Sequence, residues 1–133
     1  MKTITALFIF TVLFTFTLSS QEMMMSSGSI DSFVNLEDAQ MQAKKGPVVL
    51  FFHAGWCPTC KDSMRNLESR KDELGDITVF VVDYDSSKRE KRKYGVTYQH
   101  TFVQIDSQGK ELSKWSGGDV DEILDNVVRM EMN

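Results

Sequence analysis

The alternation of hydrophobic and polar positions divides the chain into strand-like and helix-like segments. Strands are predicted where apolar, β-branched and aromatic residues run together, at residues 48–52, 77–82 and 101–105. A turn at residues 106–109 predicts a returning hairpin strand at residues 110–115. Helices are predicted where apolar residues recur at helical spacing or charged residues lie between turn signals, at residues 32–45, 57–74, 86–94 and 119–128. The pattern therefore predicts one α/β domain, with a central mixed sheet of about four strands and helices on both faces.

Several predicted helix ends carry recognisable signals. Gly46-Pro47 ends the first helix and Gly95 ends the third. Pro58 is favoured in the first turn of the second helix, because its missing N–H costs nothing there. Asp119, with Glu122 three residues later, forms a capping-box pair for the last helix. Parallel strands come first in this arrangement, and an antiparallel hairpin comes last.

The beginning of the chain has the pattern of a secretory signal. Lys2 gives a positive start, residues 4–18 form an uncharged and largely apolar run, and Ser19-Ser20 precede polar residues. The run is too short to span a bilayer comfortably. We expect residues 1–20 to be a signal peptide, 21–31 a flexible linker and 32–133 the folded domain. The alternative is that the first segment stays uncleaved as an anchor.

The charge balance argues against one class of function, and the predicted export sets the redox context. The formal net charge is −4, and subtracting Lys2 makes it −5. This mild acidity does not favour a nucleic-acid-binding role. The basic cluster at residues 88–93 is best explained as the solvated face of a helix. Export would place the protein where disulfides form and persist.

The chain has two cysteines, Cys57 and Cys60, separated by two residues. A disulfide between them closes a very small loop and stabilises a fold little. At this spacing on a helix the Cβ atoms lie about 5–6 Å apart, so they share one face. A disulfide needs Cα atoms about 4.4–6.8 Å apart, so the pair can close within one turn. The spacing favours a redox pair over a structural disulfide.

The predicted helix start favours a thiolate at Cys57. Free N–H groups and the helix macrodipole stabilise an anion at the N-terminus. Such a placement lowers the pKa of a cysteine below its free value of about 8.5. Cys57 is expected to be the exposed attacking sulfur, and Cys60, one turn further on the core side, the resolving thiol. Pro58 fixes the backbone between them.

A lone pair of cysteines at this spacing also resembles half of a zinc site. Two more ligands would be needed, and the sequence has no second cysteine pair. The position of the pair is more informative than its spacing. A hydrophobic strand followed by Trp56, the Cys57–Cys60 motif and an amphipathic helix is typical of redox proteins.

Residues 48–60 (VVLFFHAGWCPTC) resemble the central strand and active-site loop of the thioredoxin family. Residues 94–96 resemble the segment before its substrate-binding loop, and residues 101–110 resemble its last hairpin. The resemblance implies that Cys57 is the nucleophile, that Cys60 resolves, and that Trp56 shields the pair and contacts partners. It runs from about residue 32 to the C-terminus. The family's N-terminal strand has no clear counterpart, so we expect a shortened variant.

Three departures from the family pattern surround the motif. His100 stands where the family has a cis-proline facing the sulfurs. A cis peptide without proline costs about 3–4 kcal/mol, so we expect a trans Gln99–His100 bond and a reshaped loop. Phe51 stands where the family has a buried acid that shuttles the proton of the resolving cysteine. Pro58-Thr59 replaces the usual Gly-Pro, which leaves the redox potential open.

We predict that His100 lies against the sulfurs and tunes Cys57, by charge or by accepting its proton. Histidine suits this task because it titrates near neutral pH. Two alternatives stay open: His100 only fills the loop, or it joins Cys57 and Cys60 as the third ligand of a Zn or Cu site. His53, which follows the first predicted strand, is a weaker candidate base, and a packing role near the motif is favoured for it.

The predicted function is thiol–disulfide exchange outside the cytosol, in the periplasm or after secretion. We expect cysteine-containing protein substrates, an upstream redox partner, a monomer, no organic cofactor and no stable membrane embedding after signal cleavage. Residues expected to tune the site or contact substrate are Trp56, Pro58, Thr59, Gln99 and His100, with Tyr98 as further aromatic surface. The alternatives are metal binding or delivery through the two cysteines and His100, and a non-catalytic binding module.

Overall fold

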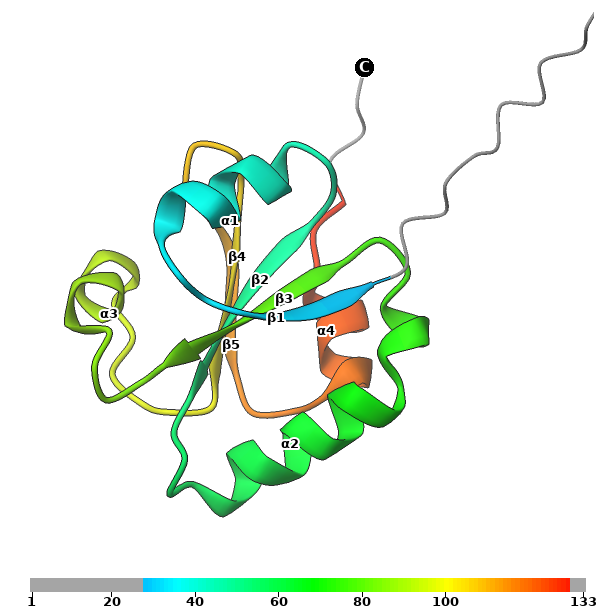
Figure 1. Cartoon of the computed structure of the whole chain (residues 1–133), viewed down its shortest axis with the longest axis vertical. Helices are drawn as coiled ribbons and strands as arrows, with labels where there is room; N and C mark the ends of the chain where they lie inside the picture. The colour runs from blue at the N-terminus through cyan, green and yellow to red at the C-terminus, as the bar shows by residue number, and fades with distance from the viewer. Residues whose placement is uncertain (1–27, 130–133) are drawn as a thin grey trace, which may run out of the picture.

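The computed structural model describes residues 28–129 and shows a five-stranded sheet with the strand order β1-β3-β2-β4-β5 (Figure 1). The strands are β1 (Ser29–Ser32), β2 (Val48–His53), β3 (Thr78–Asp83), β4 (Thr101–Ile105) and β5 (Glu111–Ser116). The helices are α1 (Leu36–Ala43), α2 (Pro58–Ser69), the 3-10 helix η1 (Lys71–Leu74), α3 (Lys88–Tyr94) and α4 (Val120–Asn126). The predicted α/β class with a mixed sheet is confirmed.

β2 lies at the centre of the sheet and carries the redox motif at its C-terminal end. It pairs in parallel with β3 and antiparallel with β4, and β4 pairs antiparallel with β5. All of β2 except its last residue is buried, because helices cover both faces of the sheet at this strand. The continuous apolar run in the sequence is the direct cause of this central position.

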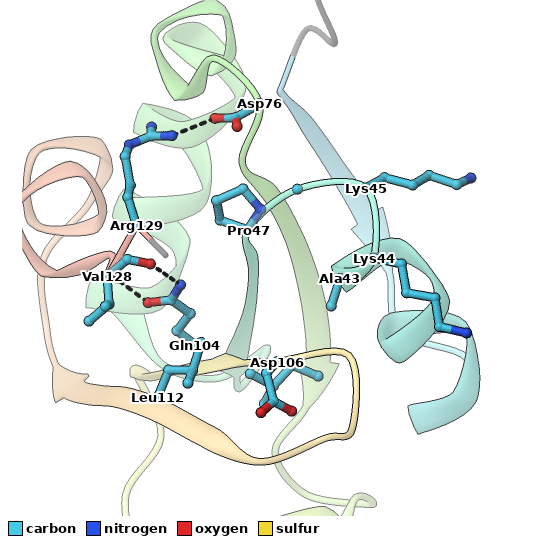
Figure 2. Close-up of a pocket in the computed structure, with 12 residues that line it drawn as sticks. Ala43, Lys44, Lys45, Pro47, Asp76, Gln104, Asp106, Leu112, Val128 and Arg129 are labelled. Carbon is cyan, nitrogen blue, oxygen red and sulfur yellow. Dashed lines mark hydrogen bonds and ion pairs between the residues drawn. The ribbon is translucent and has the colours of Figure 1, made fainter. Parts of the chain in front are cut away.

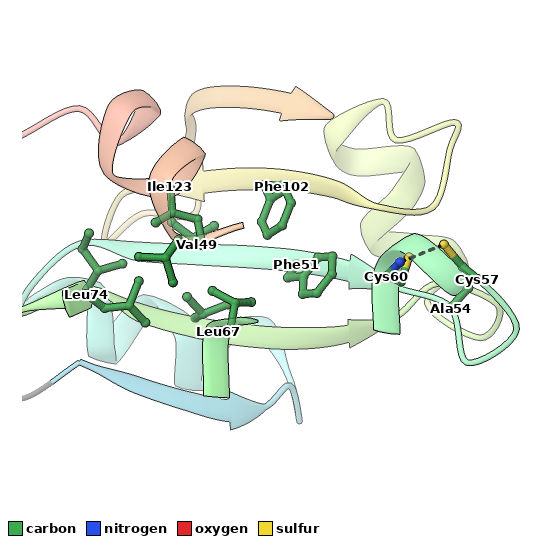
Figure 3. Packing of buried hydrophobic residues seen from close by; sticks show 12 residues of the cluster. Val49, Phe51, Ala54, Cys57, Cys60, Leu67, Leu74, Phe102 and Ile123 are labelled. Atoms are coloured by element: carbon green, nitrogen blue, oxygen red, sulfur yellow. Dashed lines mark hydrogen bonds between the residues drawn. The ribbon is translucent and has the colours of Figure 1, made fainter. Parts of the chain in front are cut away.

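Two hydrophobic clusters lie on opposite faces of the sheet. Val49 and Phe51 of β2 belong to the cluster beneath α2 and α4 (Figure 3). Leu50 and Phe52, which alternate with them, belong to the cluster beneath α1 and α3. Successive side chains of a strand point to opposite faces, so one strand supplies both cores. The first cluster includes Cys60 and so ties the redox motif to the core.

The expectation that the chain lacks an N-terminal strand is wrong. β1 pairs in parallel with β3, from Ser29 opposite Thr78 to Ser32 opposite Val81. It begins inside the segment expected to be a linker, so the sheet has one strand more than the predicted four. Its sequence, Ser-Ile-Asp-Ser, has a single apolar residue. Backbone pairing at the sheet edge, rather than a hydrophobic run, holds it in place.

Some element boundaries also differ from the sequence pattern. α1 begins at Leu36 and not at residue 32, because the Asn35 side chain accepts the Asp38 N–H and caps the helix there. α2 ends at Ser69, and the separate helix η1 covers the rest of its predicted range. The predicted capping box of Asp119 and Glu122 on α4 is confirmed.

The predicted signal peptide, residues 1–20, and most of the predicted linker lie outside the described residues. Within residues 28–129, none of the helices has the length and apolar character needed to cross a membrane.

Candidate functional site

The redox motif lies where β2 passes into α2. Cys57 is the N-cap of α2, with extended backbone angles, and Pro58 is the first helical residue. The Cys57 N–H donates to the Ala54 carbonyl at 3.1 Å, which closes the turn between strand and helix. The predicted helix start at this motif is confirmed, and proline contributes by occupying a position that needs no N–H donor.

The two sulfurs are free thiols on the first turn of α2. The Cys60 N–H donates to Cys57 Sγ at 3.2 Å, so the sulfur itself caps the helix (Figure 3). Cys57 is 2% exposed and Cys60 is fully buried. The expectation of an exposed Cys57 is therefore wrong, because its sulfur folds back onto the helix turn instead of pointing into solvent. Cys57 is still the more accessible of the two.

The surroundings of the two sulfurs shift their pKa values in opposite directions. Burial alone would raise the pKa of Cys57, but hydrogen bonds with Cys60 and Thr59 outweigh it and leave that pKa below the usual value. Burial raises the pKa of Cys60 to about 11, and the adjacent Cys57 sulfur contributes to this rise. Of the two sulfurs, Cys57 is therefore the one that ionises first as pH rises, while Cys60 keeps its proton.

His100 reaches the site from the loop before β4 in an unusual backbone conformation. Its φ of 59° makes it the one non-glycine residue with a positive φ in the described part of the chain. No cis peptide bond occurs among residues 28–129, as expected for Gln99–His100. The His100 N–H donates to the Phe52 carbonyl at 2.8 Å and its carbonyl accepts the Gly117 N–H at 2.8 Å. These two backbone bonds hold the residue in the left-handed region.

The His100 ring contacts α2 through hydroxyl groups. Nδ1 lies 3.2 Å from Thr59 Oγ1, and Thr59 Oγ1 lies 3.2 Å from Cys57 Sγ. Nε2 lies 2.7 Å from Ser63 Oγ and 3.1 Å from the Gly118 carbonyl oxygen. The structure therefore brings His100 and the cysteines into one site, with Thr59 between the ring and the sulfur.

Sequence reasoning missed Ser63 and Gly118. Ser63 is buried on α2, one turn beyond Thr59, and its hydroxyl donates to the Gly118 carbonyl. The helical spacing of Thr59 and Ser63 was a usable signal for a shared face. Gly118 was not predictable, because its carbonyl is a backbone group brought in from the loop before α4.

Phe51 occupies the position at which the family has a buried acid. It is fully buried, and its ring centroid lies 4.3 Å from that of Phe102 and 5.8 Å from that of His100. His53 lies two residues further along β2, with its ring 5.6 Å from Phe51. Burial lowers the pKa of His53, and the nearby Asp83 carboxylate opposes this shift only in part. None of the hydrogen bonds among the described residues joins the His53 ring to a cysteine.

Aromatic side chains flank the site on the surface. Trp56 is 58% exposed and Tyr98 is 69% exposed. Trp56 Nε1 donates to the Asp85 carboxylate at 3.0 Å. Pro58 is exposed, and Gln99 is half-buried beside His100. Trp56 and Pro58 flank Cys57 in the sequence, and Tyr98 and Gln99 directly precede His100.

The proposed metal ligands do not form a metal site. Residues 28–129 contain no group of three or more His, Cys, Asp or Glu side chains placed to hold a metal ion. Both ring nitrogens of His100 are engaged, Nδ1 with Thr59 and Nε2 with Ser63 and Gly118. The ring therefore has no free nitrogen to direct at a metal beside the sulfurs.

A cavity of about 200 Å³ lies at the opposite end of the sheet from the cysteines (Figure 2). Gly46 and Pro47, which precede β2, form part of its wall, whereas the redox motif follows β2. Gln104, in the same wall, donates to the Val128 carbonyl at 2.8 Å and accepts the Val128 N–H at 2.7 Å. This cavity brings no residue to the redox site.

Comparisons with known proteins agree with the geometry. The sequence model of the family described as thioredoxin matches residues 33–129. Over 84 residues the chain is 33% identical to a thioredoxin of Chlamydia trachomatis, covering 63% of this chain and 81% of that one. A reduced Schistosoma mansoni thioredoxin pre-protein superposes with a TM-score of 0.61 at 28% identity, covering 74% and 94% of the two chains. Fasciola hepatica thioredoxin gives a TM-score of 0.59 at 30% identity, covering 68% and 86%.

Proposed function

The chain belongs to the thioredoxin family and is a thiol–disulfide oxidoreductase, and from this premise we propose that Cys57 is its nucleophile and Cys60 its resolving thiol. The main support for this assignment is that Cys57 Sγ caps α2 and accepts the Cys60 N–H at 3.2 Å. A hydrogen bond to the anion and the positive end of the helix both stabilise a thiolate. Cys60 has no comparable advantage, since burial raises its pKa to about 11.

The reaction proceeds through a mixed disulfide. The Cys57 thiolate attacks one sulfur of a substrate disulfide, and the other substrate sulfur leaves as a thiolate that takes up a proton. Cys60 then loses its proton and attacks Cys57 Sγ, which releases the second substrate sulfur. The substrate gains two electrons and two protons, and the protein is left with a Cys57–Cys60 disulfide. An upstream redox partner restores the dithiol by the reverse exchange.

The substrates we propose are cysteine-containing proteins. The family implies such substrates, together with a reductant partner. Trp56, next to Cys57 in the sequence, and Tyr98, two residues before His100, are both exposed and offer amphipathic rings for contact with a substrate segment. Because Cys57 is only 2% exposed, the substrate disulfide has to be pressed closely against the start of α2. We further propose that the protein acts as a monomer, which size-exclusion chromatography with light scattering checks.

We also propose that the protein works outside the cytosol, in the periplasm or after secretion. The support is the sequence of residues 1–20, with its positive start and uncharged apolar run. Expressing the full chain beside a variant without residues 2–20, followed by fractionation and N-terminal sequencing, tests this. The full chain should leave the cytosol and begin at Gln21. Retention of both proteins in the cytosol would contradict export.

An insulin-reduction assay with dithiothreitol tests the exchange activity. The wild-type protein should accelerate reduction, and Cys57→Ser should lower the rate to that of dithiothreitol alone. Val34→Ser is a suitable control, because Val34 is 77% exposed and lies outside the site. It should retain the wild-type rate. A Cys57→Ser variant as active as the wild type would overturn the proposed role of Cys57.

A further inference from the structure

A continuous line of polar contacts joins Cys57 to the backbone at Gly118. Cys57 Sγ lies 3.2 Å from Thr59 Oγ1, and Thr59 Oγ1 lies 3.2 Å from His100 Nδ1. On the far side of the ring, His100 Nε2 lies 2.7 Å from Ser63 Oγ and 3.1 Å from the Gly118 oxygen. Every step is within hydrogen-bonding distance. The line begins at the sulfur of Cys57 and ends at the buried Ser63 and the half-buried Gly118.

The far end of this line fixes the tautomer of His100. The Gly118 carbonyl can only accept hydrogen bonds, and it already accepts the Ser63 hydroxyl. Because the Ser63 hydrogen is directed at Gly118, Ser63 Oγ is left to accept from the ring. Both neighbours of Nε2 are therefore acceptors, so Nε2 carries the hydrogen. In the neutral ring Nδ1 is then a lone pair, and it faces Thr59 Oγ1.

We propose that His100 accepts the Cys57 proton through the hydroxyl of Thr59, with Ser63 and the Gly118 carbonyl as positioning groups that hold the imidazole in the required tautomer. The inference rests on the proposed role of Cys57 as nucleophile. The sequence predicted a direct contact between His100 and the sulfurs. In the proposed relay the proton instead passes through Thr59, a residue of the redox motif.

The relay moves two protons in one direction and leaves the hydroxyl unchanged. The Cys57 S–H proton passes to Thr59 Oγ1 while the Thr59 hydroxyl proton passes to His100 Nδ1. The products are a Cys57 thiolate and a His100 imidazolium. Thr59 then donates its new proton to the thiolate and accepts from Nδ1–H, so the hydrogen bonds reverse without movement of heavy atoms. When the Cys57 sulfur is later displaced or reprotonated, the same path runs backwards.

The surroundings of the ring are compatible with this role. The aromatic rings of Phe51 and Phe102 each lie 5.8 Å from the His100 ring and offer no competing proton acceptor. Within residues 28–129 no ion pair joins His100 to a carboxylate. On α2, the remaining neighbours are the two cysteines, Thr59 and, further along, Lys61. His53 approaches from β2. Asp119 follows Gly118, and its carboxylate caps α4.

Two histidine rings lie close to the cysteines in this site. Burial and the charges of His100 and Lys61 lower the pKa of His53, which leaves His53 a poor competitor for the proton. The Cys57 thiolate is the negative charge that the relay itself creates beside the ring. The imidazolium and the thiolate are therefore expected to appear together, as a coupled pair with two macroscopic ionisations.

The pH profile of Cys57 alkylation by iodoacetamide tests the relay, using reduced full-length protein with Cys60→Ser as background. Thr59→Val removes the hydroxyl at nearly constant shape, and Thr59→Ser retains it. The relay predicts that Thr59→Val slows alkylation at neutral pH roughly tenfold and that Thr59→Ser stays near the parent rate. It also predicts two ionisations in the parent profile and one in His100→Asn, whose side chain cannot take the proton.

A second readout keeps the test decisive if His100→Asn does not fold. Nitrogen-15 NMR of the imidazole should show the Nε2–H tautomer in the neutral ring of the wild type. An Nδ1–H tautomer, or an alkylation profile unchanged in both Thr59→Val and His100→Asn, would overturn the relay. A profile altered by Thr59→Val but not by His100→Asn would also overturn it, since Thr59 would then be a simple donor. Insulin reduction that survives Cys57→Ser would instead overturn the proposed function.

Discussion

The ring of Phe51 stacks on the ring of Phe102, with centroids 4.3 Å apart and planes 8° from parallel. The pair belongs to the same buried cluster as Cys60, at the position where the family resemblance places an acid. An aromatic stack there excludes water and supplies no proton acceptor. This fits the proposal that the proton of Cys57 is handled by the hydroxyl of Thr59 and the imidazole of His100.

Returning an acid to this position should damage the fold and not improve catalysis. Phe51→Asp places an unpaired carboxylate among fully buried apolar residues and should lower the free energy of unfolding by at least about 4 kcal/mol. Phe51→Leu removes the stack but stays apolar, and should cost about 1–2 kcal/mol. Urea unfolding measures both variants. Equal stability of Phe51→Asp and Phe51→Leu would contradict the view that the site needs an apolar residue here.

Restoring the family's proline at position 100 should also be harmful. Proline fixes φ near −65°, whereas His100 has a φ of 59°, and it removes the N–H that donates to Phe52. We expect His100→Pro to lower the free energy of unfolding by roughly 2–3 kcal/mol. His100→Asn is the matched comparison, because asparagine tolerates positive φ. Thermal and urea unfolding of both variants check this, and a proline variant more stable than the asparagine variant would show that the loop refolds.

The two cysteines should differ in reactivity as pH rises. Since burial raises the pKa of Cys60 to about 11, iodoacetamide at neutral pH should modify Cys57 and spare Cys60 in the reduced protein. In Cys57→Ser, modification of Cys60 should stay slow at neutral pH and rise as the pH approaches 11. Peptide mapping by mass spectrometry follows each sulfur. Equal modification of both cysteines at neutral pH would contradict the assigned acidities.

The same raised pKa has a defined effect on stability. Folded Cys60 keeps its proton at pH values where an unfolded thiol, with a pKa of 9.0, has begun to ionise. The native state then binds more protons than the unfolded state, so stability falls as pH rises from about 9 to about 11. Comparing unfolding of Cys57→Ser with the Cys57→Ser, Cys60→Ala double variant across this window isolates the contribution. Parallel pH dependence of the two would contradict it.

The sequence was informative where local pattern and burial agree. The apolar run of β2 predicted a central strand, and Pro58 indicated the start of α2. The motif was therefore placed correctly at the junction of a strand and a helix. β1 was missed because Ser-Ile-Asp-Ser carries one apolar residue, and only pairing with β3 at the sheet edge makes it a strand. Long-range pairing of a short polar segment leaves no periodic signal.

The site was predictable in its chemistry but not in its contacts. The cysteines and the importance of His100 followed from the motif and from the position that His100 takes. The positive φ of His100 and its contact with Thr59 depend on backbone bonds to Phe52 and Gly117. The near burial of Cys57 depends on how its sulfur turns onto α2. None of these relationships is encoded by neighbouring residues alone.

Trapping the mixed disulfide distinguishes the nucleophilic sulfur from the resolving sulfur. Reduced Cys60→Ser and Cys57→Ser variants are each mixed with oxidised insulin and separated without reductant, and the covalent adduct is mapped by mass spectrometry. We predict a stable adduct through Cys57 in Cys60→Ser, because no resolving thiol remains. We predict almost none through the fully buried Cys60 in Cys57→Ser. Equal or greater trapping through Cys60 would contradict the assignment of nucleophile and resolving thiol.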